Sequence, residues 1–388
     1  MAGTLRARTF ALPSADKTVM MTVFLLAAVG VAAVYSAIAF LAETKSDGDA
    51  ERFLLRHLVR TGMALGAVGV MSLIDYRSLA KVSKHLLILA IGLLVAVQVA
   101  GVVSGGAQRW LEIGPISFQP SDFARVALLL HVAVLLARKQ DYIHDFERAF
   151  LPILVWAGPT LLLIGIEDLS TAAVVTMAIG AMCIIARVRV VHLAGMATVG
   201  LFLAGLFLMT SPERAARVEA FTGLNIFPNT VSERVFDSQA EGYQAHQSRI
   251  AFAMGGLTGV GPGKSIQRDF LPAPYNDFIF AIVAEEYGLL GATALLLLFC
   301  VLLVQGFLRI ARAAPDPLGL FLAAGLTTAI VLYGFANAAV ASGLFPVTGL
   351  PMPFVSYGGT SMVATGAMVG ILLNISRHSN ATREERPA

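Results

Sequence analysis

Asp277 lies where a glycine- and charge-rich stretch passes into a long apolar segment. The same stretch carries Lys264 and Arg268, so flexible backbone and positive charge are available to an anion near the acid. A carboxylate in this place can act as a general base toward a hydroxyl group, while the cations can bind a phosphate or diphosphate. Two prolines just before the acid predict that a new helix begins at Asp277. The alternative role of Asp277 is to favour the positive end of that helix dipole.

Glu285 and Glu286 follow Asp277 two turns further into the apolar segment. An ionisable side chain at the centre of a membrane helix costs roughly 2.5 to 3.5 kcal/mol, so both glutamates need a reason to be there. The default reason is function, and the alternative is pairing with a neighbouring helix.

A second polar cluster precedes another apolar segment. Its members are Arg109, Trp110, Gln119, Pro120, Ser121, Asp122 and Arg125. Pro120 suits a first helical turn, and Asp122 and Arg125 are three residues apart, so a charge pair opens the helix. Arg109 and Arg125 can bind a phosphate, and Trp110 can lie against a lipid or a sugar face. The alternative is an interfacial tryptophan beside a structural ion pair.

Two further clusters have stronger structural explanations. Glu167 and Asp168 can hold a divalent cation, but capping of the following helix by Asp168 or Ser170 is the favoured role. The stretch from Asn337 to Ser361 contains prolines that break one helix, while Gly358-Gly359 predicts close packing at the start of the next.

Several chemistries are excluded by the motifs. The sequence has no zinc-protease helix motif, no Walker lysine loop and no nucleophile elbow, and its seven histidines are scattered. The glycines at 259, 261 and 263 do not follow a strand, which disfavours a nucleotide fold. Cys183 and Cys300 each lie inside an apolar run and predict buried thiols. The net charge of +3 is too small to indicate a nucleic-acid partner.

The composition places these clusters in an all-α, polytopic membrane protein. Hydrophobic residues make up 57% of the chain, and the mean hydropathy is +0.75. Apolar segments long enough to cross a ~30 Å hydrocarbon core predict about ten transmembrane helices. They cover residues 18–41, 57–74, 84–103, 120–137, 150–166, 171–187, 190–209, 277–308, 318–343 and 357–375.

The distribution of lysine and arginine predicts that both termini are cytoplasmic, because most of these residues then fall in cytoplasmic segments. This topology gives a cytoplasmic N-terminal tail over residues 1–17, a membrane domain over 18–376 and a cytoplasmic tail over 377–388. The one long connection, 210–276 between the seventh and eighth helices, then lies outside together with Asp277. Within it, residues 248–257 predict a short amphipathic or half-inserted helix.

Taken together, the motifs resemble those of the SEDS family of bacterial proteins, the group that contains FtsW, RodA and SpoVE, over residues 18–377. The resemblance rests on four collinear stretches: 109–125, 242–257, 277–286 and 337–361. The Gly-Val-Gly-Pro-Gly-Lys-Ser run is more similar to the division branch, FtsW, than to RodA. This chain departs from the family pattern at Glu167 and Ser170, and it has Asp122 and Arg125 where glutamate and lysine are usual.

The resemblance implies a peptidoglycan glycosyltransferase that polymerises lipid II outside the cytoplasmic membrane, by an inverting displacement with Asp277 as general base. Candidates for the diphosphate are Arg109, Arg125, Arg249, Lys264 and Arg268. Other candidate substrate-binding residues are Trp110, Gln119, Ser121, Asp122, Gln244, Ser248, Glu285 and Ser356. The implied partners are lipid II, the nascent glycan strand, a cognate class B penicillin-binding protein, other division proteins and membrane lipids. The residues predict no protein metal site, although a Mg²⁺ or Mn²⁺ ion as cofactor stays open.

Three alternatives remain at this point. A flippase for a polyprenyl-diphosphate lipid would also need buried charge and broken helices. A RodA-like elongation polymerase would share the same chemistry, and a scaffold of the division machinery would need none.

Overall fold

The computed structural model of the 388-residue chain describes residues 15–45, 50–104, 107–113, 116–224, 241–271 and 273–384. Most of the N-terminal tail that we predicted lies outside these ranges. The α-helices are α1 (Lys17–Lys45), α2 (Ala50–Leu73), α3 (Tyr76–Ala100), α4 (Pro120–Arg138), α5 (Leu151–Glu167), α6 (Leu169–Ile185), α7 (Val190–Thr210), α8 (Pro212–Thr222), α9 (Glu241–Gly255), α10 (Ile279–Val304), α11 (Pro317–Ala341) and α12 (Thr360–Glu384). Shorter helical turns are η1 (Gln140–Tyr142), η2 (Phe146–Phe150), η4 (Gln267–Asp269) and η5 (Gln305–Ala311).

The ten apolar segments predicted from sequence all coincide with helices, namely α1 to α7 and α10 to α12. In the described part of the chain, eight helices are long and apolar enough to span a membrane, and α6 is a shorter apolar helix of 17 residues. The chain is therefore a multi-pass membrane protein. Several boundaries differ from the prediction. Helices α2 and α3 begin seven and eight residues earlier than predicted, at Ala50 and Tyr76. Helix α10 begins at Ile279 rather than Asp277, and α12 runs from Thr360 to Glu384.

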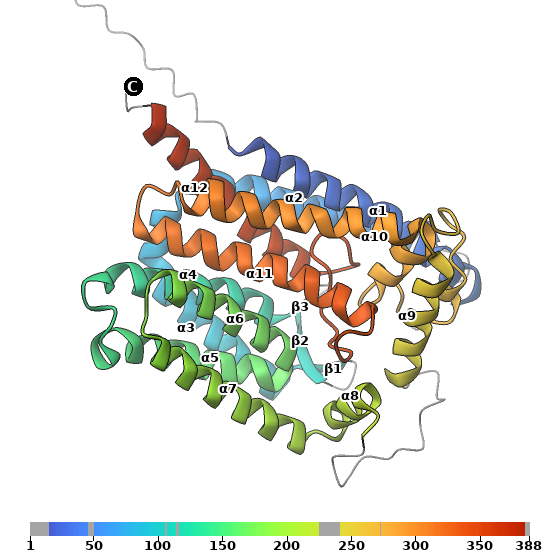
Figure 1. Cartoon of the computed structure of the whole chain (residues 1–388), viewed down its shortest axis with the longest axis horizontal. Coiled ribbons are helices and arrows are strands. Elements are labelled where there is room, and N and C mark those ends of the chain that lie inside the picture. Colours follow the sequence, from blue (N-terminus) through green and yellow to red (C-terminus); the bar gives the residue numbers. More distant parts are fainter. Residues whose placement is uncertain are drawn as a thin grey trace, which may run out of the picture.

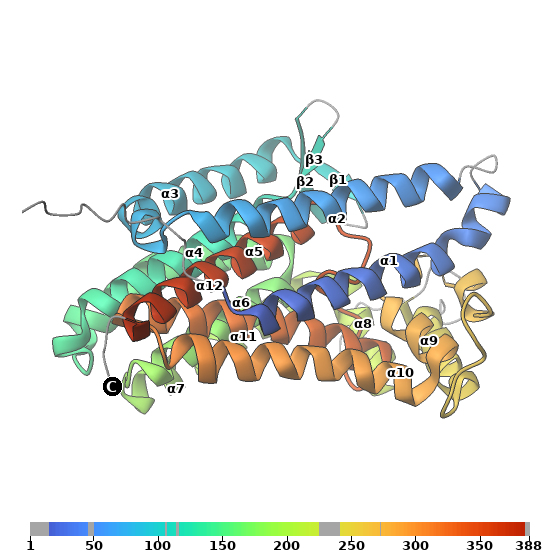
Figure 2. The ribbon, with the colours of Figure 1, turned by 90° about the horizontal axis from the view of Figure 1, so that it is seen from above.

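The long helices run side by side, with the elements of the long connection gathered at one end of the bundle (Figure 1). That end holds α8, α9 and the three strands, and we call it the loop end. The opposite end carries the α4–α5 connection and the end of α12 (Figures 1 and 2). The start of α1 lies there too, because the backbone N–H of Asp16 donates to Ser376 Oγ at 3.1 Å.

Close packing of α2 against α12 depends on glycines four residues apart on α12. A Cβ atom on Gly366 would lie 2.3 Å from the carbonyl oxygen of Ala64, and one on Gly370 would lie 2.6 Å from Met71 Cβ. Small residues at this spacing let two membrane helices approach each other closely. At the predicted pair before α12, a Cβ on Gly358 would lie 2.9 Å from Met362 Cγ, whereas one on Gly359 would meet nothing within 4 Å, so only the first glycine of the pair is closely packed.

A small antiparallel sheet connects α3 to α4 at the loop end. It consists of β1 (Val102–Ser104), β2 (Ala107–Ile113) and β3 (Ile116–Phe118), with β2 in the centre. This sheet was not predicted, and it carries Arg109 and Trp110 on β2.

Helix α10 is interrupted at Gly288, whose φ of 66° and ψ of −166° are not helical. Backbone of the α9–α10 connection supplies the hydrogen bonds that the break leaves open. Val260 N–H donates to the carbonyl of Glu285 at 3.0 Å, and Leu289 N–H donates to the carbonyl of Gly256 at 2.9 Å. The break is therefore filled by protein backbone, as the hydrocarbon region requires.

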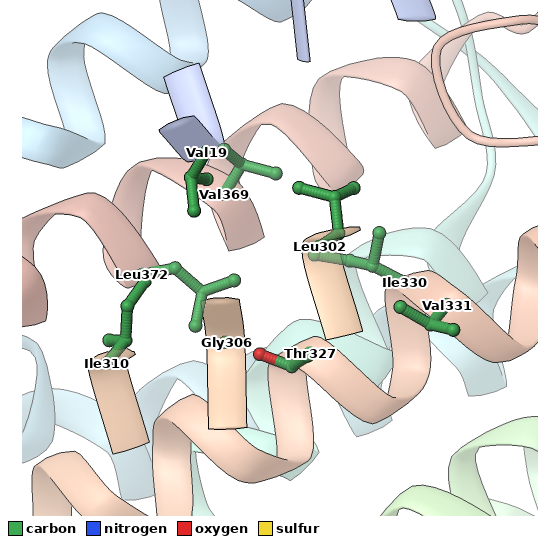
Figure 3. A pocket seen from close by; sticks show the side chains of 9 residues that line it. All are labelled: Val19, Leu302, Gly306, Ile310, Thr327, Ile330, Val331, Val369 and Leu372. Carbon is green, nitrogen blue, oxygen red and sulfur yellow. The ribbon is translucent and has the colours of Figure 1, made fainter. Parts of the chain in front are cut away.

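Away from the loop end, a small apolar cavity lies between α1, the end of α10, α11 and α12 (Figure 3). Its lining includes Val19, Leu302 and Val369, and its polar atom is the hydroxyl of Thr327, beside Gly306. The described residues that line it carry no ionisable group, so the site of chemistry has to be sought elsewhere.

Candidate active site

Asp277 lies in the turn immediately before α10, and its side chain is half-buried. It does not cap the helix, because the N-cap residue is Phe278, which has no side-chain cap. Asp277 nevertheless directly precedes the N-cap, so the alternative that its charge favours the positive end of the helix dipole stays open. Asp277 is partly exposed at the loop end of the bundle.

Burial raises the pKa of Asp277 to about 6 from its ordinary value of 3.8. Three neighbouring charges adjust it further: Arg109 and Arg217 lower the pKa of this carboxyl, and Asp168 raises it. A carboxylate with this pKa is ionised at neutral pH and is still a better proton acceptor than an ordinary aspartate. Asp277 therefore has the acid–base properties of a general base.

The neighbours of Asp277 come from three separate elements. Arg109 projects from β2, Arg217 from α8, and Asp168 from the turn between α5 and α6. Asp168 caps α6, as favoured from sequence, with Oδ1 accepting from the N–H groups of Ser170 and Thr171 at 2.9 and 3.1 Å. The loop end thus brings one base and two guanidinium groups together, which is the charge pattern that a hydroxyl acceptor and a diphosphate require.

Arg125 lies in the protein interior, with only 1% of its surface exposed. Its guanidinium pairs with Asp122 at 3.2 Å and donates to the carbonyl and hydroxyl oxygens of Ser361, both at 3.2 Å. It also stacks on Tyr333, 4.5 Å from the ring centroid. The structure therefore places Arg125 as a buried connection between α4, α11 and α12.

The rest of the second cluster packs around this ion pair. Thr360 donates its hydroxyl to Asp122 Oδ2 at 2.6 Å, and Gln119 Nε2 donates to Ser121 Oγ at 3.0 Å. Ser121 is fully buried, whereas Trp110 is half-buried on β2. Of this cluster, Arg109 is the residue whose charge lowers the pKa of Asp277.

Glu285 is fully buried and accepts hydrogen bonds from the loop that precedes α10. Its donors are Ser265 Oγ at 2.5 Å, Ile266 N–H at 2.9 Å and Gln267 N–H at 3.3 Å. Glu286 accepts from Ser36 on α1. The two glutamates thus connect α10 to the loop and to α1, which fits the alternative of pairing with neighbouring elements.

The remaining basic candidates occupy different surroundings. Arg268 donates to the carbonyl of Ser36 at 3.0 Å and pairs with Asp269 at 3.5 Å. Lys264 is exposed, and so is Arg249 on α9, which packs against Gly343.

The polar candidates on α9 and before α12 have structural contacts. Ser248 donates its hydroxyl to the carbonyl of Ala341 at 2.5 Å, while Gln244 is half-buried one turn earlier. Ser356 donates to the carbonyl of Asn276 at 2.7 Å, beside Asp277.

Arg217 is the site residue that our reading of the sequence missed. It lies in a long connection rich in charge, where a single arginine carries no distinguishing pattern. A usable signal was its spacing from Arg214, since the two are three residues apart on one face of a short helix. Arg214 donates to the carbonyl of Ile166 at 2.6 Å and so attaches α8 to the α5–α6 turn that carries Asp168.

Three comparisons place the chain among known proteins. The family model described as "Cell cycle protein", FtsW/RodA/SpoVE, matches residues 16–381. Stage V sporulation protein E of Bacillus subtilis is 37% identical over 94% of this chain and 98% of its own length. The "Probable peptidoglycan glycosyltransferase FtsW" of Geobacter sulfurreducens is 35% identical over 93% and 95%. A chain of a peptidoglycan synthase complex that coordinates polymerization and crosslinking superposes with a TM-score of 0.72 at 25% identity, covering 94% of this chain and 98% of that one. This chain therefore belongs to the FtsW/RodA/SpoVE family of cell cycle proteins.

Proposed function

We propose that this protein is a peptidoglycan glycosyltransferase that polymerises lipid II at the outer face of the bacterial cytoplasmic membrane during cell division. The observation that carries the proposal is the half-buried Asp277, with its raised pKa, near enough to Arg109 and Arg217 for their charges to lower that pKa. The names of the FtsW relatives support the activity. The FtsW of Geobacter sulfurreducens is 35% identical to this chain and a solved RodA of Thermus thermophilus is 26% identical, which supports a division role over elongation.

In the proposed reaction, a sugar hydroxyl of one lipid-linked chain attacks the anomeric carbon of the other. Asp277 accepts the hydroxyl proton as the new C–O bond forms. The bond between the anomeric carbon and the diphosphate breaks, and the diphosphate leaves with the bonding electrons. Arg109 and Arg217 stabilise the negative charge that develops on it. One such displacement converts an α-linkage into a β-linkage, so no covalent carboxylate intermediate is required.

The positions of the other candidates suggest their roles. Lys264 and Arg249 are exposed in the long connection and are candidates for contacts with substrate phosphate. Arg125, Asp122 and Glu285 are buried, and we assign them to fixing the site rather than to substrate.

The proposed partners are the nascent glycan strand, a class B penicillin-binding protein and other division proteins. The similarity to a chain of a peptidoglycan synthase complex supports an assembly with a crosslinking enzyme. A Mg²⁺ or Mn²⁺ cofactor stays a prediction. Among the described residues, no group of three histidine, cysteine or acidic side chains is placed to hold a metal ion.

The test is polymerisation of fluorescent lipid II by the purified protein together with its transpeptidase partner. We expect Asp277→Ala to lower the rate by about 10² to 10⁴, the usual contribution of a general base. Glu112→Ala is the matched control, because Glu112 is an exposed acid on the same strand as Arg109, and its loss should leave the rate within about twofold.

An Asp277→Ala protein that polymerises at the wild-type rate would eliminate the proposed base. A scaffold role would be indicated if the transpeptidase partner preparation alone produced the same polymer.

A further inference from the structure

Three consecutive backbone carbonyls lead up to the carboxylate, and each accepts a hydrogen bond from another part of the chain. Tyr357 N–H donates to the carbonyl of Tyr275 at 2.8 Å. Ser356 Oγ donates to the carbonyl of Asn276 at 2.7 Å, and Asn337 Nδ2 donates to that of Asp277 at 2.9 Å. The turn before α10 is therefore fixed by α11 and by the segment before α12.

Asn337 joins this turn to the α11–α12 connection through a single amide group. The side chain is 1% exposed, and its Nδ2 also donates to the carbonyl of Leu350 at 2.8 Å. Nearby, a Cβ atom added to Gly349 would lie 3.7 Å from Asp277 Oδ2, so the backbone of the connection runs beside the carboxylate. Loss of the Asn337 amide would thus remove the hydrogen bonds to the carbonyls of both Asp277 and Leu350.

Ser356 makes a second connection of the same kind. It is 1% exposed, and its hydroxyl accepts from Met352 N–H at 2.8 Å while donating to Asn276. A hydroxyl that both accepts and donates here can be replaced by threonine but not by alanine.

We propose that Asn337 and Ser356 are positioning residues for Asp277, which orient the base without contacting the substrate. The inference rests on the proposed function. A general base must lie within hydrogen-bond reach of its proton, and a misplacement of about 1 Å can cost roughly 10²-fold in rate. Hydrogen bonds to successive carbonyls restrict the position of the Asp277 Cα and therefore the reach of its short side chain.

The test compares Asn337→Ala, Ser356→Ala and Ser356→Thr in the full-length protein with its transpeptidase partner. Asn374→Ala is the matched control, because Asn374 is 3% exposed and its Nδ2 likewise donates to a backbone carbonyl, that of Ser72, at 3.0 Å. Asn374 lies near the other end of the bundle, so its loss tests destabilisation alone. For each variant, kcat and KM for fluorescent lipid II are measured along with amide hydrogen exchange of residues 275–280.

For the two alanine variants at the site, we expect kcat to fall at least about tenfold with KM within about twofold, and exchange at 275–280 to accelerate. Ser356→Thr should restore most of kcat, and Asn374→Ala should keep kcat and the slow exchange. An unchanged kcat and exchange in both alanine variants, or equal losses in Asn374→Ala, would overturn the inference. If wild-type protein makes no polymer, the proposed function fails while the exchange data still decide the positioning role.

Discussion

At the scale of single residues, the ionisation of Asp277 predicts how activity depends on pH. Its pKa is raised to about 6, chiefly by burial, and a general base works only when it is deprotonated. The rate of lipid II polymerisation at limiting substrate should therefore increase as pH rises through about 6, with roughly a tenfold gain between pH 5 and pH 7. An aspartate with its ordinary pKa would give a nearly flat profile over this interval.

Two variants with opposite effects check the origin of this pH dependence. Arg109 lowers the pKa of Asp277, so Arg109→Gln should move the midpoint to higher pH. Asp168 raises that pKa, so Asp168→Asn should move the midpoint to lower pH, and asparagine preserves the cap on α6. Midpoints that shift together in one direction would contradict this electrostatic account.

Among individual residues, the sequence indicated Asp277 because an acid at the junction of a polar loop and an apolar segment is unusual. The sequence did not distinguish Arg109 from Arg125, since both are basic residues flanking one helix start. Their difference is in burial, which depends on how α4 packs against α11 and α12. Arg217 was missed for the related reason that α8 brings it to the site only in three dimensions.

At the scale of elements, the buried pair of Asp122 and Arg125 connects α4 to its neighbours and predicts a large loss of stability when broken. Arg125→Ala leaves the carboxylate of Asp122 buried without its charge partner, which should lower the free energy of unfolding by about 3 to 5 kcal/mol. The matched control is Arg148→Ala, because Arg148 and Asp145 have the same spacing of three residues in an exposed pair. Its removal should cost less than about 1 kcal/mol.

Equilibrium unfolding of the two variants in detergent measures this difference. Equal losses of unfolding free energy would show that burial of the Asp122–Arg125 pair does not contribute to folding. If instead Arg125 contacts the diphosphate, its substitution should raise KM for lipid II without lowering stability.

The helices were predictable as elements because each apolar segment must cross the hydrocarbon core, and length alone identifies such segments. The sheet β1–β3 was not predictable, since strands of only three to seven residues show no clear alternation of apolar and polar side chains. The break in α10 was hidden for another reason: a single glycine, Gly288, within an apolar run is compatible with a continuous helix.

At the scale of the whole molecule, the arrangement of basic residues predicts that the loop end faces the cell exterior. Single cysteines can test this in a variant lacking Cys183 and Cys300. Thr222→Cys on α8 and Lys81→Cys on α3 are both exposed positions. In intact spheroplasts, a membrane-impermeant maleimide should label position 222, and position 81 should react only after permeabilisation. The reverse pattern would place Asp277 in the cytoplasm and remove the proposed access to external substrate.

The interruption of α10 has a mechanical consequence for the molecule. Backbone from residues 256–261 occupies the place of the missing helical turn, and a Cβ atom on Gly259 would lie 2.1 Å from the carbonyl oxygen of Glu286. The two halves of α10 and the segment that follows α9 are thus held together by backbone hydrogen bonds and close backbone packing. A protein that bound outside and displaced α9 would therefore also displace α10, because the two helices are joined through backbone hydrogen bonds.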